Sequence, residues 1–252
     1  MNGTFTISAA ARAELAPAGR LRVGINYGNV VLANRDPANG ELRGVHVELA
    51  RELGRWAGVA VELVGYAAAG TIVEALKSGA LEVGLLSYEP ARTGEIAFSP
   101  VYLEVDATYL VPPGSPLRAA VDVDRDGVRV AIAAASVYEH YLKRSLKRAT
   151  LISAPSTHEA FDLFAARRLD ALVGLRPRLV VDSERMPGSR VLDGRFMVVG
   201  QALASPRWRD AGARFLGRFI EEAMASGLVA DLLEKHGVRG VSAISPARAK
   251  RE

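Results

Sequence analysis

The fold is decided by residues 81–102, which read LEVGLLSYEPARTGEIAFSPVY. The first six residues are apolar enough for an interior strand of a parallel sheet, and such sheets bind ligands outside the carboxyl ends of their strands. Arg92 follows that strand end closely, and its planar fork of N–H donors suits a carboxylate or a phosphate. An arginine judged by position alone is more often a solvated surface residue. The aromatic, proline-bearing segment through Phe98 and Tyr102 favours a ligand clamp instead.

The composition allows a large core and excludes several functions. A chain of 252 residues with 49% hydrophobic content more naturally forms two lobes than one, and two lobes imply a cleft between them. The 32 Lys and Arg are spread among 28 acids, so the net charge of +4 does not indicate nucleic-acid binding. The absence of cysteine excludes thiol catalysis, disulfides and thiolate metal sites. No apolar stretch approaches the roughly 20 residues of a membrane span, so no membrane insertion is expected.

The N-terminal segment carries no export pattern as written. Residues 1–20 form an extension in which Ser8 to Leu15 reads as a short amphipathic helix, and no basic segment precedes an apolar run. We therefore expect either a cytoplasmic protein or a protein whose export signal was trimmed.

Strand-like and helix-like segments alternate from Leu21 onward, which predicts parallel α/β sheets. The first lobe spans 21–111 as a βαβαβ unit. Its helix over 45–57 carries an apolar stripe and ends at Gly58, a plausible left-handed cap. The elements of this lobe are predicted at 21–25, 45–57, 59–64, 71–78 and 82–86.

A second lobe is predicted over 112–196, because the proline and glycine density of 111–116 marks a connection. Its elements are predicted at 128–133, 137–148, 151–154, a helix opened by a capping box from Ser156 to Glu159, and 171–175. A strand over 196–204 returns the chain to the first lobe, so that 197–238 completes that lobe with helices over 207–226 and up to His236. Residues 239–252 form a basic flexible tail.

Three segments together resemble the family 3 solute-binding proteins of bacterial ABC importers, of the polar amino acid type. They are LRVGI at 21–25, GVHVELA at 44–50 and the stretch 82–102, and the likeness runs from about Leu21 to Gly237. The resemblance implies a type II periplasmic-binding-protein fold, with two mostly parallel sheets flanked by helices and joined by two hinge strands. It also implies a ligand held in the interlobe cleft, an ABC permease as partner, a monomer, no cofactor or metal, and a periplasmic location if a signal was removed.

The resemblance also assigns binding roles. The arginine that matches Arg92, six residues ahead of a Phe-Ser pair, binds the ligand carboxylate, and the hydroxyl at Ser87 meets the same group. Backbone N–H groups at the start of the helix after VAIAAASV (130–137) contact this anion from the second lobe. Ser136 is independently a good N-cap, and an open helix N-terminus attracts negative charge. Ala135 and Val137 replace the usual glycines of this loop, so the backbone approaches the ligand less closely.

The largest departure from the family pattern is Arg176, where amino-acid binders typically place an aspartate for the ligand ammonium. Asn26 likewise replaces the aspartate often found at the end of the first strand. A buried ammonium here would lack a charged partner, a deficit of order several kcal/mol. We therefore expect a small anionic ligand that carries a carboxylate and is not a standard α-amino acid. Arg176 then either holds a second anionic group or is a solvated loop residue.

Four further residues are candidates for ligand contact. Tyr27 and Asn29, like Asn26, follow the first strand and should line the first lobe's side of the cleft. Tyr88 can stack on the ligand or donate a hydrogen bond, and Glu89 can bind an amine. Simple loop packing explains Tyr88 and Glu89 equally well.

Two other functions remain open besides solute binding for ABC-type uptake. Dehydratases that act on cyclic carboxylates resemble these binding proteins, and Glu139, Glu89 or His140 would then supply the general acid or base. An intracellular sensing protein is the third possibility. Histidines 46, 140, 158 and 236 lie on predicted helices without metal-ligand spacing, and each is expected at the surface or at a helix end. The sequence therefore favours a protein that is not an enzyme.

Overall fold

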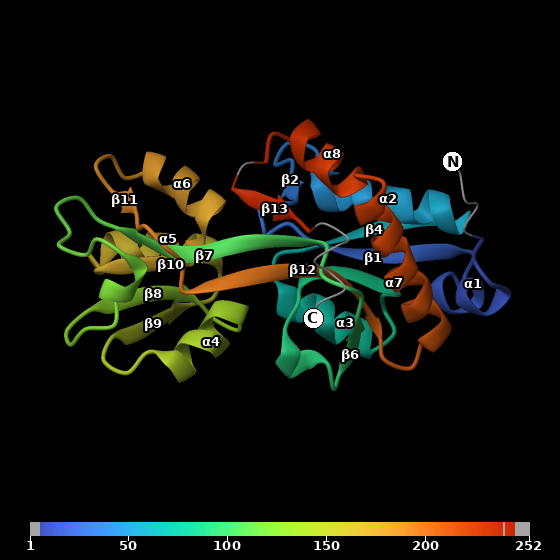
Figure 1. Cartoon of the computed structure of the whole chain (residues 1–252), viewed down its shortest axis with the longest axis horizontal. Coiled ribbons are helices and arrows are strands. Elements are labelled where there is room, and N and C mark those ends of the chain that lie inside the picture. Colours follow the sequence, from blue (N-terminus) through green and yellow to red (C-terminus); the bar gives the residue numbers. More distant parts are fainter. Residues whose placement is uncertain (1–5, 239, 245–252) are drawn as a thin grey trace. The chain divides into compact units, whose positions relative to one another are not determined.

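A computed structural model describes residues 6–238 and 240–244, and the chain divides into two compact units. Unit 1 contains 6–104, 200–238 and 242–244, and unit 2 contains Val105–Val199 with 240–241. Strands β7 (Leu103–Val111) and β12 (Met197–Pro206) carry the chain from one unit to the other (Figure 1). The division falls inside these strands, whereas the sequence places it at 111/112 and 196/197, because each connection is a continuous strand and not the proline-rich segment. Most of the predicted tail, 239–252, lies outside the described residues.

Unit 1 is a doubly wound sheet. Its strand order is β4-β1-β5-β12, in which β1 pairs in parallel with β4 and β5, while β12 runs antiparallel to β5. The elements are α1 (Ala9–Leu15), β1 (Arg20–Asn26), β2 (Asn34–Arg35), β3 (Leu42–Arg43), α2 (Val45–Ala57), β4 (Ala60–Tyr66), α3 (Ala69–Lys77), β5 (Val83–Ser87), the 3₁₀ turn η1 (Pro90–Arg92), β6 (Ile96–Phe98), α7 (Asp210–Ala225) and α8 (Leu228–Lys235).

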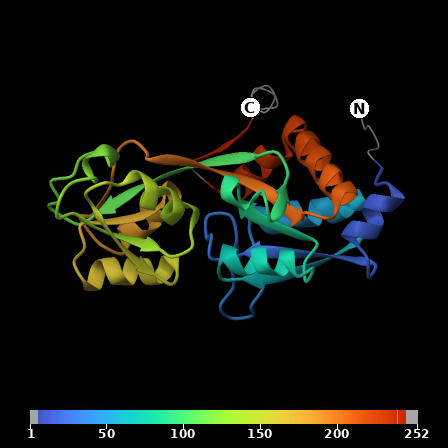
Figure 2. The same cartoon turned by 90° about the horizontal axis from the view of Figure 1, so that it is seen from below.

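Helices cover both faces of this sheet. α2 packs on β1 and β4, and α3 lies against the other face, on β5 and β1 (Figures 1 and 2). Glycines make the α3 contact close, since a Cβ at Gly24 would lie 3.1 Å from Ile72 Cγ2, and one at Gly84 would lie 2.6 Å from the same atom. The predicted bounds of α2 are confirmed, and Gly58 ends it in the left-handed conformation (φ 61°).

Unit 2 repeats the same design. Its strand order is β7-β10-β8-β9, with β8 parallel to β9 and β10, and β7 antiparallel to β10. The elements are the 3₁₀ turn η2 (Ala120–Asp122), β8 (Arg129–Ala133), α4 (Val137–Ser145), β9 (Thr150–Ala154), α5 (Thr157–Ala166), β10 (Ala171–Leu175), α6 (Arg176–Glu184) and β11 (Arg190–Val191), which pairs with β7; β13 (Val241–Ala243) pairs with β7 as well.

The core of unit 2 has two sides. Leu142 of α4 packs with Tyr109 and Val130, and Phe161 and Phe164 of α5 pack with the opposite side of the same strands. Of the predicted capping box the N-cap half is observed, because the Ser156 hydroxyl accepts from Glu159 N at 3.2 Å; the Glu159 carboxylate accepts from the same hydroxyl at 2.8 Å and not from the Ser156 backbone N–H that a full capping box uses. The α4 helix ends at Ser145, three residues before its predicted end.

A fully buried carboxylate ties the unit 1 sheet to α7. Glu82 accepts hydrogen bonds from Arg22 N at 2.9 Å, from Arg22 Nε at 3.0 Å and from Arg22 Nη2 at 2.5 Å. Arg209, next to the start of α7, lies 3.5 Å away from the same carboxylate. Because burial of an unpaired charge is costly, this paired cluster fixes how α7 joins the sheet.

His46 lies at the start of α2, which is one of the two expected places for a histidine, but it is buried (1% exposed) and not at the surface. Its Nε2 lies 2.9 Å from Tyr102 Oη, and its Nδ1 has no hydrogen-bond partner among the described residues. Burial lowers the pKa of His46 from 6.5 to about 3, so the imidazole is neutral. Of the other histidines, His236 caps the end of α8 and contacts Glu48 at 2.7 Å, and His158 is exposed, as predicted.

Among the described residues, none of the helices combines the length and the apolarity that crossing a bilayer requires.

Candidate ligand-binding site

Arg92 lies directly after the carboxyl end of β5, as the sequence predicts. It ends η1, and its Nε lies 2.7 Å from Glu89 Oε2. The side chains of Arg92 and Glu89 are only 16% and 7% exposed, so the guanidinium does not project into bulk solvent. The solvated-surface interpretation of Arg92 is therefore wrong. Glu89 is engaged by this cation, which makes it a poor partner for a ligand amine.

Ser87, the last residue of β5, is held by a residue that the sequence analysis missed. The Ser87 hydroxyl accepts a hydrogen bond from Gln201 Nε2 at 2.9 Å, and Gln201 is 1% exposed on the neighbouring strand β12. The Gln201 Oε1 atom is buried without a hydrogen-bond partner among the described residues. A buried glutamine inside an apolar strand is the signal that could have revealed this pair.

The residues after β1 form a compact turn. Asn26 Oδ1 accepts from Gly28 N at 3.0 Å, so part of this side-chain amide is used within the turn. Asn29 is half-buried, and its Oδ1 is a buried acceptor without a partner in the described part of the chain. Tyr27 continues the strand pairing, because its N–H donates to Tyr66 O at 3.0 Å.

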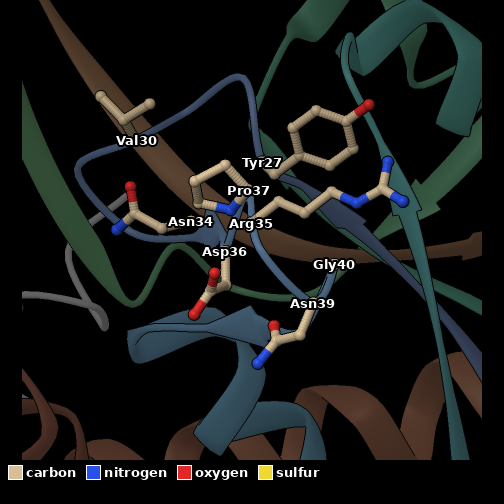
Figure 3. A pocket seen from close by; sticks show the side chains of 8 residues that line it. All are labelled: Tyr27, Val30, Asn34, Arg35, Asp36, Pro37, Asn39 and Gly40. Carbon is tan, nitrogen blue, oxygen red and sulfur yellow. The ribbon is translucent and has the colours of Figure 1, made fainter.

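A pocket of about 660 Å³ opens beside this turn, within unit 1 (Figure 3). Its lining comes from one continuous segment: Tyr27, Val30, Asn34, Arg35, Asp36, Pro37, Asn39 and Gly40. The guanidinium carbon of Arg35 lies 5.6 Å from the centroid of the Tyr27 ring, a cation–π arrangement. Of the predicted site residues, Tyr27 alone lines this pocket, and the sequence analysis missed Arg35.

Tyr88 is 37% exposed and packs edge-on against Phe98, with ring centroids 5.3 Å apart. Its backbone N–H donates to Gly200 O at 2.8 Å. Loop packing therefore accounts for the position of Tyr88, and part of its ring remains accessible.

In unit 2 the start of α4 has the predicted N-cap. The Ser136 hydroxyl accepts from Glu139 N at 3.2 Å and donates to Ala133 O at 2.7 Å. Ala135 is one of two described non-glycine residues with positive φ, at 52°, in the loop where the family resemblance implies glycine. Val137 is half-buried in the first turn of the helix.

Glu139 turns back onto this loop. Its Oε2 accepts from Ala135 N at 2.7 Å, its Oε1 accepts from Ser153 Oγ at 2.6 Å, and Lys143 Nζ lies 3.1 Å away. Burial alone would raise the pKa of Glu139, but the hydrogen bonds from Ser153, Ala135 and Lys143 outweigh it and lower the pKa. The carboxylate thus stays ionised and occupies one of the N–H groups that the sequence assigns to the ligand.

Arg176 departs most from expectation, because it opens helix α6 and is not a loop residue. Its guanidinium donates to the carbonyl oxygen of Leu192 at 3.2 Å and to that of Gly194, while Nε lies 3.9 Å from Asp106 Oδ2. Arg195 lies 3.2 Å from the same Asp106 carboxylate. Arg176 therefore braces the segment that follows α6, which weakens its predicted role as a ligand for a second anionic group.

Within the part of the chain that the structure describes, no group of three or more His, Cys, Asp or Glu side chains could hold a metal ion.

Two α/β units, each built on a mostly parallel sheet and linked by two strands, define the class of two-lobed, periplasmic-binding-protein-like folds. Residues 21–239 match the model of the bacterial extracellular solute-binding proteins, family 3, and the chain belongs to this family. The predicted fold class and the resemblance are thereby confirmed. Members of the family bind small ligands such as amino acids and deliver them to ABC transporter permeases.

Known relatives agree with this assignment. A glutamine-binding protein of Geobacillus stearothermophilus is 23% identical over 188 residues, which cover 71% of this chain and 69% of the relative. The solved structure of the solute receptor for L-cysteine of Neisseria gonorrhoeae superposes with a TM-score of 0.79 at 20% identity, covering 92% of this chain and 95% of that one. An ancestral amino acid-binding protein, described as a precursor of cyclohexadienyl dehydratase, gives a TM-score of 0.78 at 23% identity and covers 90% and 99% of the two chains.

Proposed function

We propose that this solute-binding protein captures a small carboxylate that carries no ammonium group and presents it to an ABC permease. The observation that carries the proposal is Arg92, a nearly buried guanidinium at the carboxyl end of β5, five residues after the Ser87 hydroxyl. A charge-assisted bond to a carboxylate is stronger at such a site than in water. The anion is thus expected to bind at the strand end of unit 1.

Unit 2 contributes backbone donors at the start of α4. The N–H groups from Ala135 to Val137 lie at a helix N-terminus, where negative charge is favoured. Glu139 already accepts from the Ala135 N–H, so we propose that the ligand relies on its neighbours Ser136 and Val137. In this proposal Arg92 of unit 1 supplies the charge, and unit 2, taken by itself, offers the N–H groups of Ser136 and Val137.

The exclusion of an ammonium is supported by the state of the acids within each unit, because each of them already has a partner. Glu89 is paired with Arg92, Glu139 receives three donors, and Asp106 is shared between Arg176 and Arg195. Asn26 spends its side-chain oxygen on Gly28. An α-amino group would have to displace one of these partners, at a cost of several kcal/mol for a buried charge.

A thermal-shift titration tests the proposal with a panel of small monocarboxylates, dicarboxylates, phosphonates and standard amino acids. A carboxylate without an amine should raise the melting temperature in proportion to the logarithm of its concentration above its Kd, and its α-amino counterpart should do so more weakly. Arg92→Ala should abolish the effect, and Arg92→Lys should recover only part of it, since lysine lacks the planar fork. Stronger stabilisation by standard amino acids, or full binding by Arg92→Ala, would contradict the proposal.

The dehydratase alternative keeps one supporting observation, the likeness to the precursor of cyclohexadienyl dehydratase. Against it, the Glu139 oxygens already accept from Ala135 N and Ser153 Oγ and lie beside Lys143, so the ionised carboxylate has no proton to give as an acid and is engaged where a base would have to act. Product analysis on each ligand that stabilises the protein decides between the two functions, because a binding protein returns its ligand unchanged. Export to the periplasm and the monomeric state belong to the proposal as well, and fractionation of the native cell and light scattering test them.

A further inference from the structure

Arg35 is an arginine that lines the pocket of unit 1. Across residues 6–238 and 240–244, no oxygen accepts a hydrogen bond from its guanidinium and no carboxylate lies within 4.0 Å of it. The neighbouring Arg43 differs, because it lies 2.7 Å from Glu41 and 3.7 Å from Asp36. The two arginines occupy the same hairpin, and only Arg43 is paired.

Two other polar side chains of the hairpin, Asp36 and Asn39, accept hydrogen bonds within the turn itself. Asp36 Oδ1 accepts from Ala38 N at 2.8 Å, and Asn39 Oδ1 accepts from Glu41 N at 2.9 Å. Gly40 adopts a positive φ of 74°, and a Cβ there would lie 3.4 Å from Arg35 Nη2. The hairpin is therefore folded so that the Arg35 side chain extends past Gly40 toward the Tyr27 ring (Figure 3).

Tyr27, which lines the pocket, and Ser87 stand at the carboxyl ends of two neighbouring strands of the unit 1 sheet. β1 and β5 are parallel neighbours with Ile25 opposite Leu85, so Tyr27 and Ser87 each stand two residues beyond the same pair. Adjacent strands are about 5 Å apart. A short ligand that meets Ser87 with one end can thus reach the pocket with the other, entirely within unit 1.

We propose that Arg35 selects the ligand by binding a second acidic group, which makes the solute a small dicarboxylate. The inference rests on the proposed function and replaces Arg176 as the residue for the second group, because the Arg176 guanidinium is bonded to the carbonyl oxygens of Leu192 and Gly194. Tyr27 orients the Arg35 guanidinium and covers one of its faces. A charge-assisted hydrogen bond in such a pocket changes affinity by about tenfold or more.

The test measures binding of succinate, glutarate and adipate against butyrate, pentanoate and hexanoate by isothermal titration calorimetry. The wild type should bind at least one dicarboxylate about tenfold more tightly than the monocarboxylate of equal length, and Arg35→Gln should remove that preference without weakening the monocarboxylate. Arg43→Gln is the matched control, since it makes the same charge change on the same hairpin and should leave the preference intact. Tyr27→Leu should lower the affinity for the dicarboxylate by roughly threefold, because the Arg35 guanidinium loses its cation–π partner.

Several results would overturn the inference. The first is an equal loss of dicarboxylate affinity in Arg35→Gln and Arg43→Gln. The second is an equal loss of dicarboxylate and monocarboxylate affinity in Arg35→Gln. The third is a wild type that binds dicarboxylates and monocarboxylates of equal length with the same affinity. Arg92→Ala separates this failure from failure of the proposed function, because it should abolish both classes of ligand. If Arg92→Ala binds normally, the carboxylate anchor is wrong; if no carboxylate binds the wild type, the anchor and the Arg35 inference fail together.

Discussion

Acidification should destabilise unit 1 through His46. The imidazole is 1% exposed, and protonation would place a new N–H at Nδ1, where the described residues offer no acceptor. The pKa is about 3 in the folded protein and 6.5 in the unfolded chain. Between these values the unfolded state binds a proton that the folded state does not, so stability falls as the pH falls. Tyr102 does not compensate, because burial raises its pKa and keeps its hydroxyl neutral.

The size of the effect follows from these two pKa values. From about pH 7 to about pH 5, the proton taken up by the unfolded chain lowers the free energy of unfolding by about 2 kcal/mol. Urea unfolding followed by tryptophan fluorescence measures it, because Trp56 and Trp208 both belong to unit 1, as His46 does. The quantity to compare is the change in unfolding free energy with pH, since carboxyl groups titrate in every variant.

Two variants make the measurement specific. His46→Gln cannot titrate, and its stability should fall less than that of the wild type by about 2 kcal/mol over this pH range. His158→Gln removes an imidazole that is 68% exposed and should follow the wild type. If the wild type and His46→Gln show the same pH dependence, the buried neutral imidazole is refuted as its source.

Three further substitutions test interactions inside unit 1 or inside unit 2. Glu82→Gln should lower the free energy of unfolding by about 3 kcal/mol in urea titrations, because it leaves Arg22 without its buried partner, whereas Glu62→Gln on the exposed edge should change little; equal losses would contradict the role of the buried cluster. Ala135→Gly should stabilise unit 2 by roughly 0.5 kcal/mol, as relief of the positive φ exceeds the entropy gained by the unfolded chain, and a lower melting temperature by circular dichroism would argue against backbone strain there. Ser136→Ala should cost about 1 kcal/mol through loss of the N-cap, and an unchanged melting temperature would show that the cap contributes nothing.

The strand and helix pattern was predictable where one periodicity dominated. The stripe of α2 and the stop at Gly58 gave that helix its correct bounds. Helix α6 was missed because only Leu179 and Asp182 are buried along it, which leaves no apolar stripe, and because its start at Arg176 has no side-chain cap. A helix with an apolar stripe and a glycine stop, such as α2, is therefore predictable from its own residues, and a helix without them, such as α6, is not.

The candidate site was predictable in its positions and not in its partners. Arg92 and Ser87 stand at the end of β5, as expected, but Gln201 reaches Ser87 from 114 residues away in the sequence. His46 meets Tyr102 across 56 residues, and no pattern in the helix reports that contact. Long-range hydrogen bonds decide which donors remain for a ligand, and one sequence without its fold does not contain them.

The path of the chain through its units has a consequence for biosynthesis. Unit 2 is formed almost entirely by one uninterrupted segment, whereas unit 1 needs residues from both sides of it. When a ribosome has made the first 110 residues, β5 has β1 on one edge, while its other edge waits for β12, which is translated some 90 residues later. The nascent chain must keep an apolar strand edge unpaired for seconds, a state prone to aggregation. Unit 2 is therefore expected to fold first, and pairing of β12 with β5 to complete the unit 1 sheet last. A chain whose translation stops before β12 should leave the β5 edge unpaired and be insoluble.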